Sequence, residues 1–173
     1  SLLAAQIFML DFQAARWLMD RDVAQQAGNN HPTSIPTGVF ETKDGHINIA
    51  ATGQVIWERF CKAMDAEDLM TDERYSTGAA RSENRDTVNT EINSRTKKRD
   101  SATWIEFFNE TGVPAGEINS IDQVFADPQV QHLKMSETVH SETIGNLNLV
   151  AQAVKLNRTP GTIALAPPER GEH

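Results

Sequence analysis

The chain has 173 residues, of which 39% are hydrophobic and 23% are charged, a composition typical of a globular protein of about one domain. Its formal net charge of −8 gives it no general attraction to nucleic acid or to an anionic membrane, so we expect neither as a partner. A single cysteine, Cys61, excludes an internal disulfide and favours a reducing, cytoplasmic location.

The first predicted element is a helix that is apolar on nearly every side. Leu3, Ile7 and Leu10 open a run at helical spacing that ends near Gly28. Charged residues follow the first apolar turns and no basic region precedes them, which excludes a signal peptide or a membrane segment. Such a helix requires cover on both sides, and the sequence starts inside its pattern. We therefore expect the chain to be a piece of a longer protein.

Two short strands and a helix come next. Residues 39–42 and 47–51 have strand composition, and Asp44-Gly45 between them predicts a hairpin because this pair tolerates the positive φ of tight turns. The following apolar side chains repeat at i, i+3, i+4 and i+7, which predicts a helix with one buried face. They are Trp57, Phe60, Cys61 and Met64. Cys61 is expected to act there as a small core hydrophobe.

The middle of the chain predicts several more helices. Val88 and Ile92 anchor a helix over residues 81–96. Ser101 is expected to cap another helix, which Gly112 ends. Further on, a capping box and an Asp-Pro pair predict two short helices. These start signals are Ser120-Ile121-Asp122-Gln123 and Asp127-Pro128.

The last part of the chain changes to period two. From Met135 on, alternating residues predict one or two hairpins around Gly145-Asn146. The tail over residues 159–173 is rich in Pro, Gly and Ala and has no periodicity, so we expect an extended segment whose cover lies elsewhere. The expected fold class is therefore α+β, with a compact unit over residues 28–156.

Generic searches for catalytic motifs leave few candidates. The sequence has no phosphate-binding glycine loop, no dinucleotide fingerprint and no nucleophile elbow, and its five histidines are scattered, so we expect no metal site. His31 sits in a Gly-Asn-Asn-His-Pro loop and is either a ligand-binding or a turn residue. Residues 112–116 either shape a backbone pocket or end a helix, and the basic run 97–99 either contacts a phosphate or complements a helix dipole. The residues alone favour the structural interpretation of each.

Six groups of motifs lie in order along nearly the whole chain. They are Gly28-Asn29-Asn30-His31-Pro32 with Pro36-x-Gly38-x-Phe40-x-Thr42-x-Asp44-Gly45, Trp57-Glu58-Arg59-Phe60-Cys61, Asp72-Glu73-Arg74-Tyr75 with Ala80-Arg81 and Asn84-Arg85, Gly112-Val113-Pro114-Ala115-Gly116, Val124-Phe125-Ala126-Asp127-Pro128-Gln129-Val130, and Ala166-Pro167-Pro168 with Gly171-Glu172-His173. In this order they resemble the family III coenzyme A transferases, also called the CaiB/BaiF family. Each motif alone is weak, and together they form a specific pattern.

The resemblance implies an enzyme that transfers coenzyme A between carboxylic acids. In such enzymes an aspartate becomes an acyl anhydride and then an aspartyl-CoA thioester, a form of covalent catalysis. Coenzyme A takes part as the acyl-CoA substrate, and no metal is implied. Each subunit resembles a large Rossmann-like domain joined to a small α+β domain, and two subunits interlock as a homodimer.

The resemblance covers the small domain and its connections. It implies a connecting helix from the large domain over residues 1–27, the small α+β domain over 28–156, and a segment returning to the large domain over 157–173. The nucleophilic aspartate would lie upstream, and no aspartate of residues 1–173 is given its role. The isolated chain is therefore expected to be inactive. Its expected partners are acyl-CoA, a carboxylic acid and the missing large domain.

Departures from the family pattern bear on two alternatives. The α-methylacyl-CoA racemase branch resembles Glu-Pro-Gln-Phe where this chain has Gln54-Val55-Ile56-Trp57, so the carboxylate that would help to move a proton is missing. Thr37 stands where a tyrosine is common, and the glycine-rich loop of the formyl-CoA branch is absent around residues 29–35, which disfavours oxalate or formate as substrates. The other alternative is a non-catalytic binding module. The apolar N-terminal helix disfavours it, since its exposed face would drive association.

The loop before the first strand holds the predicted site residues. By the resemblance, residues 28–36 cross from the large domain into the small one, near the cleft between them. We therefore predict that Asn29, Asn30 and His31 lie close to substrate or CoA, where they orient it by hydrogen bonds. No catalytic nucleophile is predicted within the chain.

Overall fold

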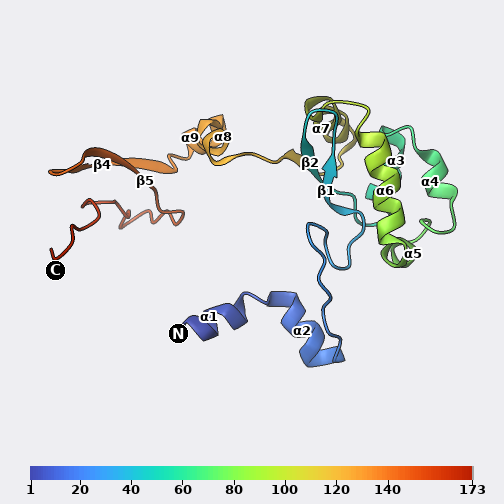
Figure 1. The fold of residues 1–173 in the computed structure, drawn as a ribbon, viewed down its shortest axis with the longest axis horizontal. Coiled ribbons are helices and arrows are strands. Elements are labelled where there is room, and N and C mark those ends of the chain that lie inside the picture. Colours follow the sequence, from blue (N-terminus) through green and yellow to red (C-terminus); the bar gives the residue numbers. More distant parts are fainter. Residues whose placement is uncertain (173) are drawn as a thin grey trace. The chain divides into compact units, whose positions relative to one another are not determined.

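The computed structural model describes residues 1–172 of the chain (Figure 1). The chain forms two compact units, one over residues 1–118 and one that begins at Asn119. Each unit combines short helices with a small antiparallel sheet. The predicted α+β class is therefore confirmed.

A three-stranded antiparallel sheet organises the first unit. Its order is β1 (Thr37–Glu41), β2 (His46–Ala50) and β3 (Ala115–Glu117), so β2 is the central strand. Because side chains alternate across a strand, Phe40 of β1 and Ile47 of β2 share the core face, and both are buried. Both predicted strands are confirmed.

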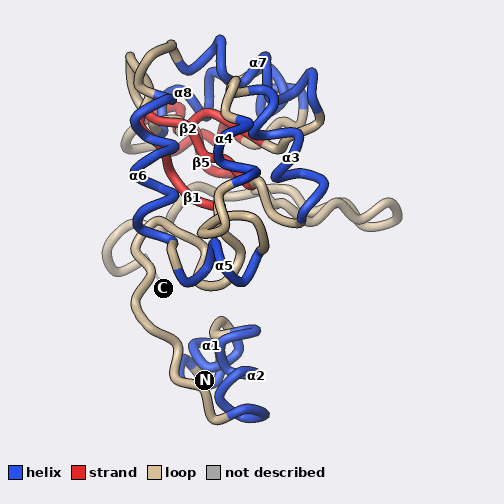
Figure 2. Tube along the Cα trace, turned by 90° about the vertical axis from the view of Figure 1, so that its right-hand side faces the viewer, coloured by secondary structure: helices blue, strands red, loops and turns tan. Residues whose placement is uncertain are grey.

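Helices complete the core of the first unit. Their bounds are α3 (Gln54–Ala63), α4 (Glu67–Thr71), α5 (Gly78–Glu83), α6 (Arg85–Thr96) and α7 (Ser101–Thr111). Helix α6 packs beside β1, α7 packs against β2 and β3, and α3 contacts both α4 and α7 (Figure 2). The predicted buried stripe of α3 is confirmed, and α7 adds two buried aromatic rings. These side chains are Trp57, Phe60, Cys61, Trp104 and Phe108.

The helix predicted over residues 81–96, anchored by Val88 and Ile92, is confirmed from Arg85 on, but its first residues belong to a separate helix, α5. Helices α5 and α6 meet at Asn84, whose backbone leaves the helical region with φ −104° and ψ 28°. The Asn84 side-chain amide donates to the carbonyl oxygen of Ala80 at 3.0 Å and to that of Arg74 at 3.3 Å. An asparagine amide that competes for backbone acceptors in this way interrupts a helix.

Two local predictions are wrong in detail: Ser101 as the cap of α7, and a positive φ in the turn between β1 and β2. Asp100, not Ser101, caps α7, because its carboxylate accepts from the backbone N–H of Thr103 at 3.0 Å. The backbone N–H and hydroxyl of Ser101 donate to Asp44 Oδ1 at 2.8 and 2.9 Å, and these bonds hold the pKa of Asp44 below its ordinary value. Gly45 does not adopt a positive φ. The Asp44 carboxylate, rather than left-handed backbone, therefore stabilises this turn.

The N-terminal segment forms two short helices, so the continuous helix predicted over residues 1–27 is wrong. Helix α1 (Leu2–Phe8) and helix α2 (Asp11–Asp20) are separated where Asp11 takes φ 47°. Aspartate tolerates this left-handed conformation better than most side chains do. Neither of these two helices contains a buried residue. Within residues 1–172, no helix is long and apolar enough to cross a membrane.

The second unit is a pair of short helices followed by a hairpin. Its elements are α8 (Ile121–Ala126), α9 (Pro128–His132), β4 (Ser136–Ser141) and β5 (Gly145–Val150). The predicted capping box at Ser120, the Asp127 cap with Pro128 in the first helical position, and the hairpin are all confirmed. Residues 151–172 contain no helix or strand.

Cys61 is a buried core residue, as predicted. Burial raises the pKa of its thiol to about 12, because desolvation disfavours the thiolate. The thiolate is the reactive form, so we expect Cys61 at pH 8 to react at least about 100-fold more slowly than an exposed cysteine. The reaction with an aromatic disulfide reagent, followed with and without denaturant, measures this ratio. Equal rates in the two conditions would contradict the buried position.

Candidate functional site

The loop over residues 28–36 folds back against the first strand. An isolated β-bridge pairs Asn30 with Gly38. The backbone N–H of His31 donates to the carbonyl oxygen of Thr37 at 2.8 Å. The backbone of the loop that carries the predicted site residues is therefore fixed to β1.

His31 has one ring nitrogen engaged and one free. Its Nδ1 accepts from the backbone N–H of Thr33 at 3.2 Å and from that of Ser34 at 2.9 Å. Since both partners are donors, Nδ1 is unprotonated and the proton of the neutral ring lies on Nε2. The half-buried ring stacks on Phe12 with a centroid distance of 5.6 Å and an interplanar angle of 3°. Within residues 1–172, no residue accepts from Nε2, which leaves one oriented donor for a ligand.

Asn30 and Asn29 differ in what their side chains do. Asn30 Oδ1 accepts from Asn89 Nδ2 of helix α6 at 3.0 Å, so this side chain anchors the loop to the helix. Gly38 lets the loop approach, because a Cβ there would lie 2.7 Å from Asn30 Oδ1 and 2.9 Å from the carbonyl oxygen of Asn29. The Asn29 side chain is exposed and available. The structure thus brings His31 and Asn29 to the surface and gives Asn30 a supporting role.

Arg81 holds the end of the same loop and was not predicted as a site residue. Its Nε donates to the carbonyl oxygen of Ile35 at 3.1 Å, and its Nη1 donates to that of Tyr75 at 2.8 Å. The guanidinium lies 4.7 Å from the ring centre of Trp57, and the residue is only 1% exposed. An arginine in the Ala-Arg-x-x-Asn-Arg motif of the sequence was the signal that could have found it, since a charge at a buried helical position requires a reason.

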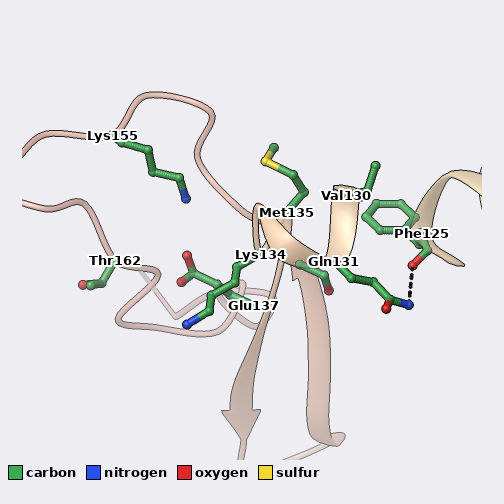
Figure 3. Close-up of a pocket in the computed structure, with 9 residues that line it drawn as sticks. Phe125, Val130, Gln131, Lys134, Met135, Glu137, Lys155 and Thr162 are labelled. Carbon is green, nitrogen blue, oxygen red and sulfur yellow. Dashed lines mark hydrogen bonds between the residues drawn. The ribbon is translucent and has the colours of Figure 1, made fainter. Parts of the chain in front are cut away.

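A groove of about 490 Å³ lies within the second unit and is a weaker candidate (Figure 3). Lys134, Lys155 and Glu137 supply its charged groups, and Phe125 and Met135 supply apolar surface. Both lysines are exposed, and Glu137 is only partly buried. A groove whose charges remain solvated has little capacity to select a ligand.

Two side chains of this loop carry hydrogen-bond donors that no described residue engages. His31 Nε2 and the Asn29 amide are hydrogen-bond donors suited to a carbonyl or carboxylate oxygen. In the part of the chain that the structure describes, no group of three or more His, Cys, Asp or Glu side chains is placed to hold a metal ion.

Comparison with known proteins identifies the family. The sequence model of the family described as CoA-transferase family III matches residues 1–173. The chain belongs to this family. It is 30% identical, over all 173 residues, to the human protein named succinyl-CoA:glutarate CoA-transferase, of which it covers 40%. It is equally identical to the succinate–glutarate CoA-transferase of Agrobacterium fabrum, of which it covers 43%.

A solved structure supports the same family. The crystal structure of a CaiB/BaiF family protein from Brucella suis superposes with a TM-score of 0.76 at 26% identity. The match covers 96% of this chain and 43% of that protein. The chain thus spans about 40% of the length of the curated relatives that it matches. The predicted family is confirmed, and the α+β unit accords with one part of a larger family III CoA-transferase.

Proposed function

We propose that the protein containing this chain transfers coenzyme A from an acyl-CoA to a carboxylic acid. The match of the family III model to residues 1–173 carries this proposal. Relatives named as succinyl-CoA:glutarate and succinyl-CoA:mesaconate CoA-transferases support it. Acyl-CoA and a carboxylic acid are then the substrates.

The transfer that we propose proceeds through an aspartate outside residues 1–173. Its carboxylate attacks the thioester carbonyl of the donor, the C–S bond breaks, CoA leaves as a thiolate, and a mixed anhydride forms. The thiolate then attacks the aspartyl carbonyl, which releases the donor acid as a carboxylate and leaves an aspartyl-CoA thioester. The acceptor carboxylate then attacks the aspartyl-CoA thioester, which forms a second anhydride and releases CoA as a thiolate. This thiolate attacks the acceptor's carbonyl, which gives the product acyl-CoA and frees the aspartate. No step consumes an oxidant or a reductant.

The loop over residues 28–36 would serve this reaction by orientation. His31 Nε2–H and the Asn29 amide would donate to an acyl carbonyl or an acid carboxylate. A hydrogen-bond donor orients a ligand most effectively when the donor is already fixed before the ligand binds. Asn30 would keep the loop in position through Asn89. This chain then supplies binding and orientation, and the nucleophile comes from elsewhere in the protein.

A transfer assay tests the proposal. The protein containing this chain is incubated with succinyl-CoA and glutarate, and the CoA esters are separated and weighed by mass spectrometry. We expect glutaryl-CoA and free succinate, together with an enzyme thioester that hydroxylamine cleaves. The chain of residues 1–173 alone should give no turnover. If the protein forms no new CoA ester with glutarate, mesaconate or malate as acceptor, the proposal fails.

A racemase is the second enzymatic candidate, and the start of α3 disfavours it. The first turn of α3 contains no acidic residue, so no carboxylate is available there to move an α-proton. A racemase would exchange the α-proton of a 2-methylacyl-CoA in deuterated water without an acceptor acid. A CoA-transferase should show no such exchange.

The assembly and location of the protein are also proposals. Relatives are longer than this chain, which supports a large domain that packs on residues 1–27 and 157–173 around the small domain of residues 28–156. Exposed apolar side chains on α1 and α2, such as Leu2 and Phe8, support contact with that domain or with a second subunit. We propose an interlocked homodimer in the cytoplasm.

A further inference from the structure

A small pocket lies between the end of the loop and the starts of two helices. Its volume is about 220 Å³. Loop residues, the residues before α3, and the first turn of α5 line it together. The lining residues used below are Ser34, Gly53, Gln54, Gly78 and Arg81.

Arg81 brings a positive charge to this pocket that no acidic side chain neutralises. Its hydrogen-bond partners are the carbonyl oxygens of Ile35 and Tyr75 and, at 3.4 Å, Gln54 Oε1, all of them uncharged. No ion pair among residues 1–172 involves Arg81. Burial lowers the pKa of its guanidinium, yet arginine stays charged near neutral pH. Buried charges are normally paired, so an unpaired one in a pocket indicates a missing anion.

One nitrogen of Arg81 is free on the pocket side. Nε and Nη1 make the bonds described above, and no described residue accepts from Nη2. Nη2 lies 3.8 Å from the position that a Cβ on Gly78 would occupy, and Gly78 itself lines the pocket. Because Gly78 has no side chain, none lies between its backbone and Nη2.

The N-terminus of α3 adds a second anion-attracting group to the same pocket. Helix α3 has ten residues, its N-cap is Gly53, and no side chain caps it. The amides of its first turn therefore lack intrahelical acceptors and carry the positive end of the helix dipole. Gly53 takes φ 79° and ψ 151°, and a Cβ added there would meet nothing within 4 Å, so the entrance is open at this side. No acidic residue occupies the first turn.

We propose that this pocket binds the free carboxylate of a dicarboxylic acid, the one that does not react with CoA. The proposal rests on the proposed CoA transfer and names the substrate class of that same site. A carboxylate fits the planar donors of Arg81 and the first-turn amides of α3. The backbone N–H of the lining residue Ser34 also donates to His31 Nδ1, so the pocket adjoins the His31 ring. The Nε2 donor of that ring is the one that we assign to the reacting carboxylate of the acid.

The substitution Gln54→Glu tests the pocket without removing Arg81 from the core. Gln54 Oε1 already lies 3.4 Å from Arg81 Nη1, so a glutamate there would neutralise the guanidinium and weaken its attraction for a second anion at Nη2. The variant loses the bond from Gln54 Nε2 to Glu58 Oε1 at 3.2 Å and places two carboxylates four positions apart, at a cost of about 0.5 kcal/mol. A carboxylate in the first turn of a helix favours folding by a similar amount, so this variant should fold. The matched control is Ala102→Glu, which adds the same charge to the exposed first turn of α7, away from the pocket.

Calorimetric titration of the protein containing this chain with glutarate and with butyrate measures binding without turnover. We expect glutarate to bind at least tenfold more tightly than butyrate, and Gln54→Glu to remove that difference while Ala102→Glu keeps it. Equal binding of glutarate to wild type and Gln54→Glu would overturn the proposal. So would displacement of glutarate by inorganic phosphate at equal concentration, because the pocket would then be a phosphate site. Glutarate binding without CoA transfer would refute the proposed function but not the pocket.

Discussion

Replacing Phe108 with alanine is expected to lower the free energy of unfolding by about 3–5 kcal/mol, the usual cost of deleting a buried aromatic ring. Phe108 is 0% exposed and joins two elements of the core. Its ring lies 5.3 Å from that of Phe60 in α3 and 5.5 Å from that of Trp104 in α7, both in stacked arrangement. Chemical denaturation followed by tryptophan fluorescence measures the change.

The matched control for Phe108 is Phe8, which is 86% exposed. Measured on the chain of residues 1–173 by itself, Phe8→Ala deletes the same ring from α1 and should change the free energy of unfolding by no more than about 0.5 kcal/mol. If the two substitutions cost the same, the packing of α3 against α7 is not what stabilises the first unit.

The substitution Gly38→Ala is expected to displace the candidate site. The added methyl group would lie 2.7 Å from Asn30 Oδ1 and 2.9 Å from the carbonyl oxygen of Asn29, and a backbone atom cannot yield without moving the loop. We expect a loss of about 1–3 kcal/mol in stability. Because the loop would shift His31, we also expect kcat/KM for CoA transfer to fall at least about tenfold.

Gly116 provides the control on the same sheet. It lies opposite Asn48 in β3, and a Cβ there would meet nothing within 4 Å. Gly116→Ala should therefore change the free energy of unfolding by no more than about 0.5 kcal/mol. It should leave kcat/KM for CoA transfer within about twofold of wild type. Unchanged transfer by Gly38→Ala, measured in the same assay, would show that the position of the loop does not matter to the reaction.

Elements with a strong local signal were predictable from the sequence. The apolar stripe of α3, the capping box at Ser120 and the Asp-Pro start of α9 each depend on residues within a few positions of one another. Strand β3 was missed because Ala115-Gly116-Glu117 has no strand composition of its own. Its pairing with β2 provides the hydrogen bonds, and no local pattern reports such a partner.

The position of the candidate site was predicted from the sequence and stays a prediction, whereas the contacts within it were not predicted. The loop with Asn29, Asn30 and His31 followed from motif resemblance. The sequence did not show that Asn30 anchors the loop while Asn29 and His31 keep free donors. That difference depends on Asn89, which is 59 positions from Asn30. Arg81 was also beyond local reasoning, since its bond to Ile35 spans 46 positions and its buried state is a property of the folded core.

Two variants of His31 distinguish a ligand-binding residue from a turn residue. His31→Asn keeps a side-chain acceptor near the place of Nδ1 for the N–H groups of Thr33 and Ser34, and it removes the Nε2 donor. His31→Gln instead keeps a donor amide near the place of Nε2, and its acceptor lies farther out than Nδ1. The first variant therefore preserves the turn, and the second preserves the proposed contact with substrate.

The central claim is that the loop over residues 28–36 orients the acid for CoA transfer, and steady-state kinetics of His31→Asn tests it most directly. We predict a melting temperature within about 4 °C of wild type, since the turn bonds remain and only the stacking on Phe12 is lost. We also predict that kcat/KM falls at least about tenfold, and that His31→Gln recovers part of the loss. Wild-type values of kcat and KM for His31→Asn would contradict the claim and leave His31 as a turn residue.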